Sequence, residues 1–257
     1  MKKSSILIFL FSLITCATLA APSREYYELR TYRFTSIAQQ ERVETYLQKA
    51  LLPSLHRLGI KRVGVFKPVE TDSTYGKKLI ALIPFRSFDD FESMAEKLAK
   101  DKQYLEDGKD YIDAVFDNPP YARIETIILK AFSEMPISAV PDLKLPVNER
   151  IYELRSYEGH TEKIYRNKVQ MFNAGDEVGL FKRLGFNAVF YGEVLAGSTM
   201  PNLMYMTSFE NQASRDEHWK AFGQDPQWKK LSSMPEYQHN VSKNVTRFFR
   251  PTSYSDI

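Results

Sequence analysis

The chain contains two copies of one folding unit, and this internal repeat constrains its fold more than any other feature. Residues 27–32 read Tyr-Glu-Leu-Arg-Thr-Tyr, and residues 152–157 read Tyr-Glu-Leu-Arg-Ser-Tyr. Later landmarks return in the same order, so that Asp101 in the first copy corresponds to Asp225 in the second. A long internal period usually determines the architecture of a chain. The repeat therefore predicts two similar halves related by an approximate twofold axis.

Each copy shows the same order of secondary structure, which is strand, helix, strand, strand, helix, strand. The strands are predicted from runs of alternating, β-branched and aromatic residues, and the helices from apolar residues at helical spacing. The long helix of the first copy contains Pro53, which should bend it or begin a new turn. The long helix of the second copy is predicted at residues 162–184. The expected strands are residues 26–34, 63–68, 78–85, 122–129, 151–157, 188–194, 203–209 and 245–249.

This order of elements describes a ferredoxin-like unit, in which an antiparallel sheet carries both helices on one face. The other face of the sheet is bare, and two copies in one chain can bury both bare faces against each other. We therefore expect an α+β fold of two tandem ferredoxin-like βαββαβ units, packed sheet to sheet as a pseudo-dimeric α/β barrel. The expected domains are residues 21–134 and 150–257, joined by a linker at 135–149 that contains three prolines.

The first twenty residues are typical of an export signal. Lys2 and Lys3 precede an apolar run that is too short to anchor the chain in a membrane. Cleavage before Ala21 is favoured over lipid attachment at Cys16, because Thr15 fits the lipid-attachment pattern poorly. The protein is therefore expected to be exported, either periplasmic or secreted, with no membrane span after cleavage. Cys16 is the sole cysteine, so the mature chain has no thiol for a disulfide, a metal site or a nucleophile.

Charge and motif patterns exclude several classes of function. The formal net charge is +3, of which Lys2 and Lys3 contribute two charges, and basic residues form no stripe, so nucleic-acid binding is not expected. The four histidines show no metal-ligand spacing and the sequence has no acidic cluster, so no metal site is predicted. The sequence also lacks a glycine-rich phosphate loop and a nucleophile elbow. These absences direct attention to a cavity in the barrel or to the seam between the halves.

A duplicated polar set on the first strand of each copy provides the main candidate binding residues. Alternation places these side chains on one face of each strand, and Leu29 and Leu154 on the other face suit the helix-covered side. The polar set should therefore point into the barrel, where charged groups must be paired or hydrated. It could hold an anion or an enolate with arginines and tyrosines, or it could be a Glu–Arg network that ties the two sheets together. Its members are Glu28, Arg30, Tyr32, Glu153, Arg155 and Tyr157.

His160 is the best candidate for a catalytic residue, since it follows the first strand of the second copy at the mouth of the unit. It could act as a general base or as a haem ligand, or it could be a solvated loop histidine. Trp219, Phe222 and Trp228 could form an aromatic box, although aromatic residues at helical spacing are more often core or docking residues. His160 and both tryptophans occur in the second copy alone. A working site is therefore expected in the second half.

The sequence resembles the NIPSNAP family across nearly all of the mature chain. The resemblance rests on the repeated Tyr-Glu-Leu-Arg opening, on residues 218–222 and 225–228, and on the closing residues 247–251. The second copy is the closer match, since the first copy has Ala95 at the position of Trp219. The resemblance implies the fold of the dimeric α/β-barrel superfamily. Proteins of this superfamily include haem-handling proteins and small oxygenases that act on quinone-like molecules, whereas NIPSNAP members have no agreed catalytic residues.

Three kinds of function follow from these observations. The favoured one is an exported protein that binds a small apolar or aromatic molecule in the barrel or in the seam. The second is an enzyme of the oxygenase or isomerase kind, with a cavity near His160 and the paired arginines and with haem as a candidate cofactor. The third is a non-catalytic module that forms homo-oligomers through its outer sheet edges or its helices, since a ferredoxin-like edge strand is open to pairing. The residues leave the choice among these three open.

Overall fold

The computed structural model of the protein describes residues 23–197 and 199–257. The expected export signal at residues 1–20, with Cys16, lies outside these described residues. No helix in the described part of the chain is long and apolar enough to span a membrane.

The first half contains β1 (Tyr26–Arg33), α1 (Ile37–Tyr46), η1 (Leu47–Leu51), α2 (Leu52–Arg57), β2 (Gly64–Pro68), β3 (Lys78–Phe85), α3 (Phe88–Ala99), α4 (Lys102–Asp107), α5 (Lys109–Ile112) and β4 (Arg123–Ala131). The second half contains β5 (Ile151–Glu158), α6 (Glu162–Asn173), α7 (Glu177–Arg183), β6 (Ala188–Ala196), β7 (Asn202–Phe209), α8 (Gln212–Gln224), α9 (Pro226–Ser233), η2 (Pro235–Tyr237) and β8 (Lys243–Pro251).

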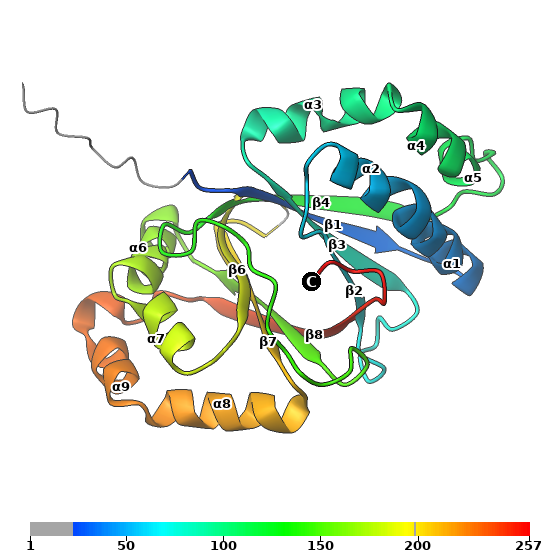
Figure 1. The fold of residues 1–257 in the computed structure, drawn as a ribbon. Coiled ribbons are helices and arrows are strands. Elements are labelled where there is room, and N and C mark those ends of the chain that lie inside the picture. Colours follow the sequence, from blue (N-terminus) through cyan, green and yellow to red (C-terminus); the bar gives the residue numbers. More distant parts are fainter. Residues whose placement is uncertain (1–22, 198) are drawn as a thin grey trace, which may run out of the picture.

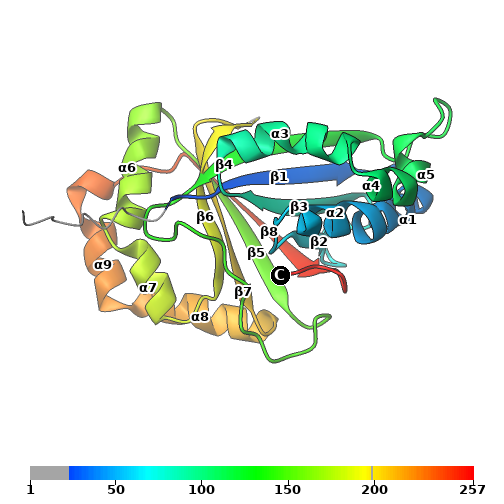
Figure 2. The same cartoon turned by 45° about the horizontal axis from the view of Figure 1, so that its top comes forward.

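The strands form a closed antiparallel barrel with the order β1-β3-β2-β8-β5-β7-β6-β4. The halves are joined at two places, where β2 pairs with β8 and β4 pairs with β6. Figure 1 shows the barrel between two groups of helices, with α1–α5 beside the strands of the first half and α6–α9 beside those of the second. The tilted view in Figure 2 shows the same separation of the two helix layers. This arrangement confirms the predicted fold class.

Polar side chains begin the helices at equivalent positions in the two halves. The side chains of Ser36, Ser87, Thr161 and Asn211 each accept a hydrogen bond from the backbone N–H three residues later. Each cap satisfies one of the N–H groups that a helix leaves unpaired at its start. Ser36 and Thr161 begin the first helix of each half, and Ser87 and Asn211 begin the second major one. The repeat is therefore visible in helix starts as well as in strands.

Both long helices of the repeat are interrupted. In the first half, the π-helical turn η1 ends two residues before Pro53, which has no N–H for the helical hydrogen bond to the carbonyl four residues earlier. In the second half, Gly175 and Asp176 separate α6 from α7, and Asp176 adopts the left-handed conformation with φ of 61°. The interruption near Pro53 was predicted, whereas the prediction of one continuous helix at residues 162–184 was wrong.

The barrel interior is filled by apolar side chains from both halves. Aromatic rings meet across the junctions between the halves, with centroids 5.3 Å apart for Tyr27 and Phe190 and 5.1 Å apart for Phe66 and Tyr152. The inside of the barrel is therefore a packed apolar core. The buried residues of this cluster are Tyr27, Leu29, Phe66, Ile80, Leu82, Leu129, Ala131, Leu143, Tyr152, Leu154, Val189, Phe190, Val194, Met204, Met206, Phe249 and Ile257.

The predicted orientation of the first strands was wrong. Leu29 and Leu154 belong to the barrel core, so the alternating polar set faces the helices outside the barrel. Glu153, for example, accepts hydrogen bonds from two residues of α8. In a closed barrel both faces of a strand are covered, and alternation alone does not show which face takes the apolar side chains. The duplicated Glu–Arg pairs therefore lie beneath their own helices and do not face each other across the axis.

The predicted linker is held against the barrel by two carboxylates. Glu25, just before β1, accepts hydrogen bonds from the N–H and the hydroxyl of Ser138, at 2.7 and 2.9 Å. Glu210, just after β7, accepts hydrogen bonds from the N–H groups of Leu145 and Lys144, and these bonds hold the pKa of its carboxyl below the ordinary value. Because the two carboxylates come from different halves, they fix both ends of the connection.

We expect Phe66→Ala to lower the free energy of unfolding by about 3–5 kcal/mol, because it removes a fully buried ring and leaves a cavity in the barrel core. Phe116→Ala is a matched control, since Phe116 is fully exposed, and it should change that free energy by less than about 0.5 kcal/mol. Urea unfolding followed by circular dichroism measures both values. Equal stability of the two variants would contradict a packed barrel interior.

Candidate functional site

A buried carboxylate organises the helix-covered side of the second half. Glu153 lies on β5 and is fully buried. Its two oxygens accept hydrogen bonds from Nε and Nη2 of Arg215 on α8, at 2.8 and 3.0 Å, and Oε2 also accepts one from Nε1 of Trp219 at 2.8 Å. Such pairing is required, because an unpaired charge in the protein interior is very unfavourable. Helix α8 is thereby attached to the sheet through a charged contact.

Arg155, two residues along the same strand, is left with an incomplete set of partners. Its Nη1 lies 3.3 Å from Oε1 of Glu153, an oxygen that α8 already occupies. Its guanidinium lies over the ring of Trp219, 4.2 Å from the centroid, in a cation–π contact. Its Nε is buried and has no hydrogen-bond partner among the described residues. A buried N–H without a partner costs roughly 1–3 kcal/mol, so Arg155 is the less completely satisfied of the two arginines around Glu153.

The first half satisfies the equivalent charges differently. Arg30 donates from Nε and Nη2 to both oxygens of Glu28, at 2.8 and 2.9 Å, and the hydroxyl of Thr126 donates a third bond at 3.0 Å. Arg30 also donates to the hydroxyl of Tyr32 at 3.3 Å. The strand arginine therefore saturates the carboxylate in the first half, whereas Arg215 from a helix does so in the second. This difference between the copies is what leaves Arg155 with a buried donor.

Four further polar side chains extend the set toward the ends of α6 and α7. The hydroxyls of Tyr157 and Tyr205 lie 2.9 Å apart. Burial raises the pKa of Tyr157 to about 12 and the pKa of Tyr205 well above its ordinary value, so both phenols remain protonated at physiological pH. Lys168 of α6 donates to Oε2 of Glu177 at 2.8 Å, and both side chains are buried. The second half thus contains a buried layer of charged side chains and neutral hydroxyls between sheet and helices.

A cavity of about 260 Å³ opens onto this polar layer. Tyr157 and Lys168 form part of its wall, together with the indole of Trp228 and the side chains of Tyr237 and Asn240 from the segment before β8. The Lys168 ammonium lies 5.8 Å from the Trp228 ring centroid. The wall of the cavity therefore combines aromatic residues, an asparagine and a buried lysine. Pockets with a few converging polar groups are the usual form of small-molecule sites.

The predicted residues separate into three groups. Tyr157 lines the cavity, and Arg155 and Glu153 lie behind it in the same polar layer. Glu28, Arg30 and Tyr32 form the corresponding layer of the first half, away from this cavity. His160 is exposed on the turn before α6 and is not among the residues of the cavity wall, so it provides no enclosed position for a haem. Within residues 23–197 and 199–257, no group of three or more His, Cys, Asp or Glu side chains is placed to hold a metal ion.

Sequence reasoning missed Lys168, Glu177 and Arg215 as members of the site. A signal for Lys168 exists, because it lies three residues after Tyr165 and four before Phe172, on the buried face of α6. A lysine on the apolar face of a helix must find a partner in the interior. No comparable signal identifies Arg215, since α8 is largely polar around most of its circumference.

Comparison with known proteins finds a family similarity for the second half of the chain. Residues 152–256 match the model of the NIPSNAP family. A comparison with curated proteins finds no match. The similarity to the NIPSNAP family therefore covers the second half of the chain.

Several solved structures share the fold over both halves. A protein from Lactobacillus acidophilus described as a candidate monooxygenase has a TM-score of 0.58 at 11% identity, covering 89% of this chain and 94% of that one. A second candidate monooxygenase, from Fusobacterium nucleatum, has a TM-score of 0.54 at 6% identity, covering 89% and 93%. An anthrone oxidase-like protein has a TM-score of 0.53 at 11% identity, covering 90% and 93%. At these identities the similarity establishes the architecture alone.

Lys168→Met should lower the free energy of unfolding by about 3–5 kcal/mol, because it leaves the buried Glu177 carboxylate without its cation. The double variant Lys168→Met/Glu177→Leu removes both charges and should recover most of that loss. Urea unfolding of the wild type and both variants tests this. A single variant as stable as the wild type would show that Glu177 finds another partner or that water reaches it.

Proposed function

We propose that the protein binds a small aromatic molecule bearing a hydroxyl or carbonyl oxygen in the cavity of its second half. The observation that carries this proposal is that Tyr157 and the buried Lys168 line the same cavity as Trp228, whose ring lies 5.8 Å from the Lys168 ammonium. An ammonium group has three N–H donors. Lys168 uses two of them, toward Glu177 and toward the sulfur of Met171 at 3.2 Å. The third donor is available to a ligand oxygen.

The size and lining of the cavity support a ligand of one or two rings. Its volume of about 260 Å³ lies just below the range of about 300–1,000 Å³ that is usual for drug-sized ligands. Trp228 can stack on a ring of the ligand, and aromatic pairs of this kind contribute roughly 0.5–1.5 kcal/mol beyond buried area. The barrel interior, by contrast, is filled by the apolar core. The helix-covered side of the second half is therefore better suited to a ligand than the barrel.

The two tryptophans of the chain make this proposal directly measurable. Trp219 and Trp228 are the sole tryptophans, so a nitrogen–proton correlation spectrum contains two indole signals. Titration with 2-naphthol should shift the Trp228 signal in a saturable way and shift the Trp219 signal less. Tyr157→Phe removes one hydrogen-bonding hydroxyl and should weaken binding about 10-fold.

Tyr75→Phe is the matched control, because Tyr75 is exposed and distant in the fold from this cavity. It should leave the affinity for 2-naphthol unchanged. A titration without saturation, or equal affinities for the two tyrosine variants, would reject the second-half cavity as the binding site.

A second candidate function is oxygenation of such a ligand. The guanidinium of Arg155 lies behind the cavity wall, 5.6 Å from the centroid of the Tyr157 ring, and its positive charge could stabilise an oxygen that becomes negatively charged during reaction. The architectures of two candidate monooxygenases and an anthrone oxidase-like protein are similar to that of this chain. In anthrone oxidation, the ring methylene and O₂ yield the ketone and water, so no further reductant is needed.

Oxygen uptake with anthrone as the substrate distinguishes this function from binding alone. If the protein is an oxygenase, uptake should be stoichiometric with quinone formed, and Arg155→Gln should reduce it at least 10-fold. Arg123→Gln, at an exposed arginine, should leave the rate unchanged. Uptake equal to that of a protein-free solution would leave binding as the function of the site.

The oligomerisation hypothesis receives less support. It named two surfaces, an open edge strand that could pair with another chain and the outer helices. In the described part of the chain the sheet is closed, because β2 pairs with β8 and β4 pairs with β6. A homo-oligomer would therefore have to form through helices or loops.

A further inference from the structure

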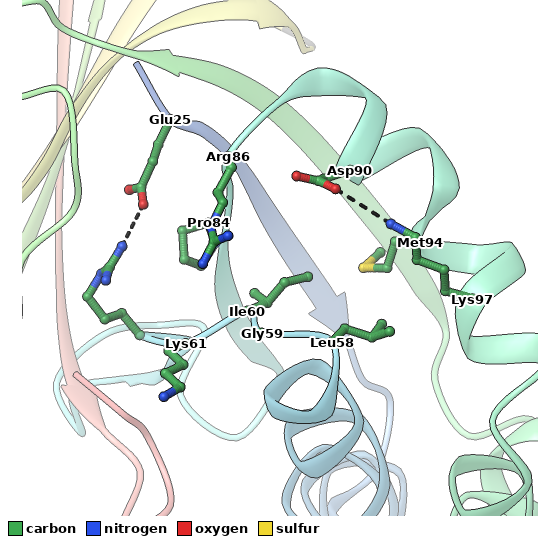
Figure 3. Close-up of a pocket in the computed structure, with 11 residues that line it drawn as sticks. Glu25, Leu58, Gly59, Ile60, Lys61, Pro84, Arg86, Asp90, Met94 and Lys97 are labelled. Atoms are coloured by element: carbon green, nitrogen blue, oxygen red, sulfur yellow. Dashed lines mark hydrogen bonds and ion pairs between the residues drawn. The ribbon is translucent and has the colours of Figure 1, made fainter. Parts of the chain in front are cut away.

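A second cleft lies on the first half, outside the site described above. Its volume is about 400 Å³, and it lies between the loop after α2, the end of β3 and helix α3. Figure 3 shows Leu58 and Ile60 on the loop side of this cleft, with Pro84 at the end of β3 and Met94 on α3. These four side chains give the cleft an apolar floor.

The rim of the same cleft carries an excess of positive charge. Glu25 is paired with Nη2 of Arg62 at 2.5 Å, and Asp90 is paired with Lys97 at 3.5 Å. In Figure 3, Arg86 lies between these two pairs. Arg86 is exposed and makes no ion pair within residues 23–197 and 199–257. Lys61 adds a further cation to the lining, so the two carboxylates are compensated and Arg86 is available to an anion.

The loop that forms one wall of the cleft has a fixed path. Gly59 has φ of 80° and Arg62 has φ of 62°, and a left-handed conformation is uncommon for a residue with a side chain. Arg62 is held there by its contacts, since it donates to Glu25 and, from Nε, to the hydroxyl of Ser138 at 3.2 Å. The buried Glu25 thus positions both the linker and this wall. The cleft is therefore a preformed feature of the first half.

The repeat shows how the two halves differ at this cleft. Ile60, Met94 and Ala95 occupy the positions that Phe186, His218 and Trp219 hold in the second copy. There the three rings pack together, with centroids 4.9 Å apart for Phe186 and Trp219 and 5.8 Å apart for Phe186 and His218. Phe186 is buried, so the space between loop and helix is filled in the second half. Smaller side chains leave it open in the first.

We infer that this first-half cleft binds a small amphipathic carboxylate, with its apolar body against Ile60 and Met94 and its carboxylate on Arg86. A planar guanidinium can donate two parallel hydrogen bonds to a carboxylate, which favours Arg86 over a lysine as the anchor. The apolar floor provides area for a hydrocarbon body, and burial of such area favours binding. This inference concerns a different half of the molecule and does not depend on the aromatic-binding site.

Isothermal titration calorimetry with sodium octanoate tests the inference on the wild-type protein. We expect saturable binding that weakens as salt concentration rises, because salt screens the exposed guanidinium. Arg86→Glu should weaken binding at least 10-fold, and Arg86→Lys should weaken it less. Ala95→Trp introduces the second-copy side chain at the edge of the cleft and should also weaken binding. Lys220→Glu, an exposed charge reversal on α8, is the matched control and should bind octanoate as the wild type does.

Two results would overturn the inference. One is the absence of saturable octanoate binding to the wild type. The other is binding that is equal in Arg86→Glu and Lys220→Glu, or that is lost in Tyr157→Phe, because the ligand would then occupy another site. Unchanged octanoate binding in Tyr157→Phe, together with loss in Arg86→Glu, would support two independent sites in the two halves.

Discussion

Closure of the barrel through the pairings β2–β8 and β4–β6 is the constraint on which the remaining structure depends. Closure encloses one face of every strand, so apolar residues of both halves share a single dry core. The charged residues of β1 and β5 are then confined to the helix-covered side, where they need partners. Helix α8 supplies Arg215 and Trp219 to Glu153. The position of the candidate site between sheet and helices is thus a consequence of how the two halves join.

The two halves share a backbone plan but satisfy their buried charges in different ways. In the first half, Arg30 saturates Glu28 along the strand. In the second half, a helix arginine takes over that role, and Arg155 is left with a buried donor beside two tyrosine hydroxyls. The two halves also differ in the space between the loop before β2 or β6 and helix α3 or α8. Aromatic side chains fill this space in the second half, whereas a cleft lies there in the first half. Duplication therefore produced two chemically distinct cavities on one symmetric frame.

Much of the fold could be predicted from the sequence, and less of the site. The strand positions follow from alternation, and the interruption near Pro53 follows from its missing N–H. The break at Gly175 and Asp176 was missed, because the apolar spacing of the helix continues on both sides of it. Tyr157 was identified as a binding candidate, but Lys168 and Glu177 were not, since their partnership is a contact across a helix break. His160 had a suitable residue type and position in the chain, yet it is exposed on a turn.

The sequence by itself determined the repeat, the order of elements in each half and the ferredoxin-like class, because periodicity and capping are local properties of the chain. It also indicated that chemical differences are concentrated in the second copy. The tertiary structure alone decided which face of β1 and β5 points inward. Both faces of these strands are covered, so local alternation assigns residues to two faces without saying which one is the barrel core. The same limit applies to the cavities, since each is formed by side chains from segments that meet through closure of the barrel and packing of the helices.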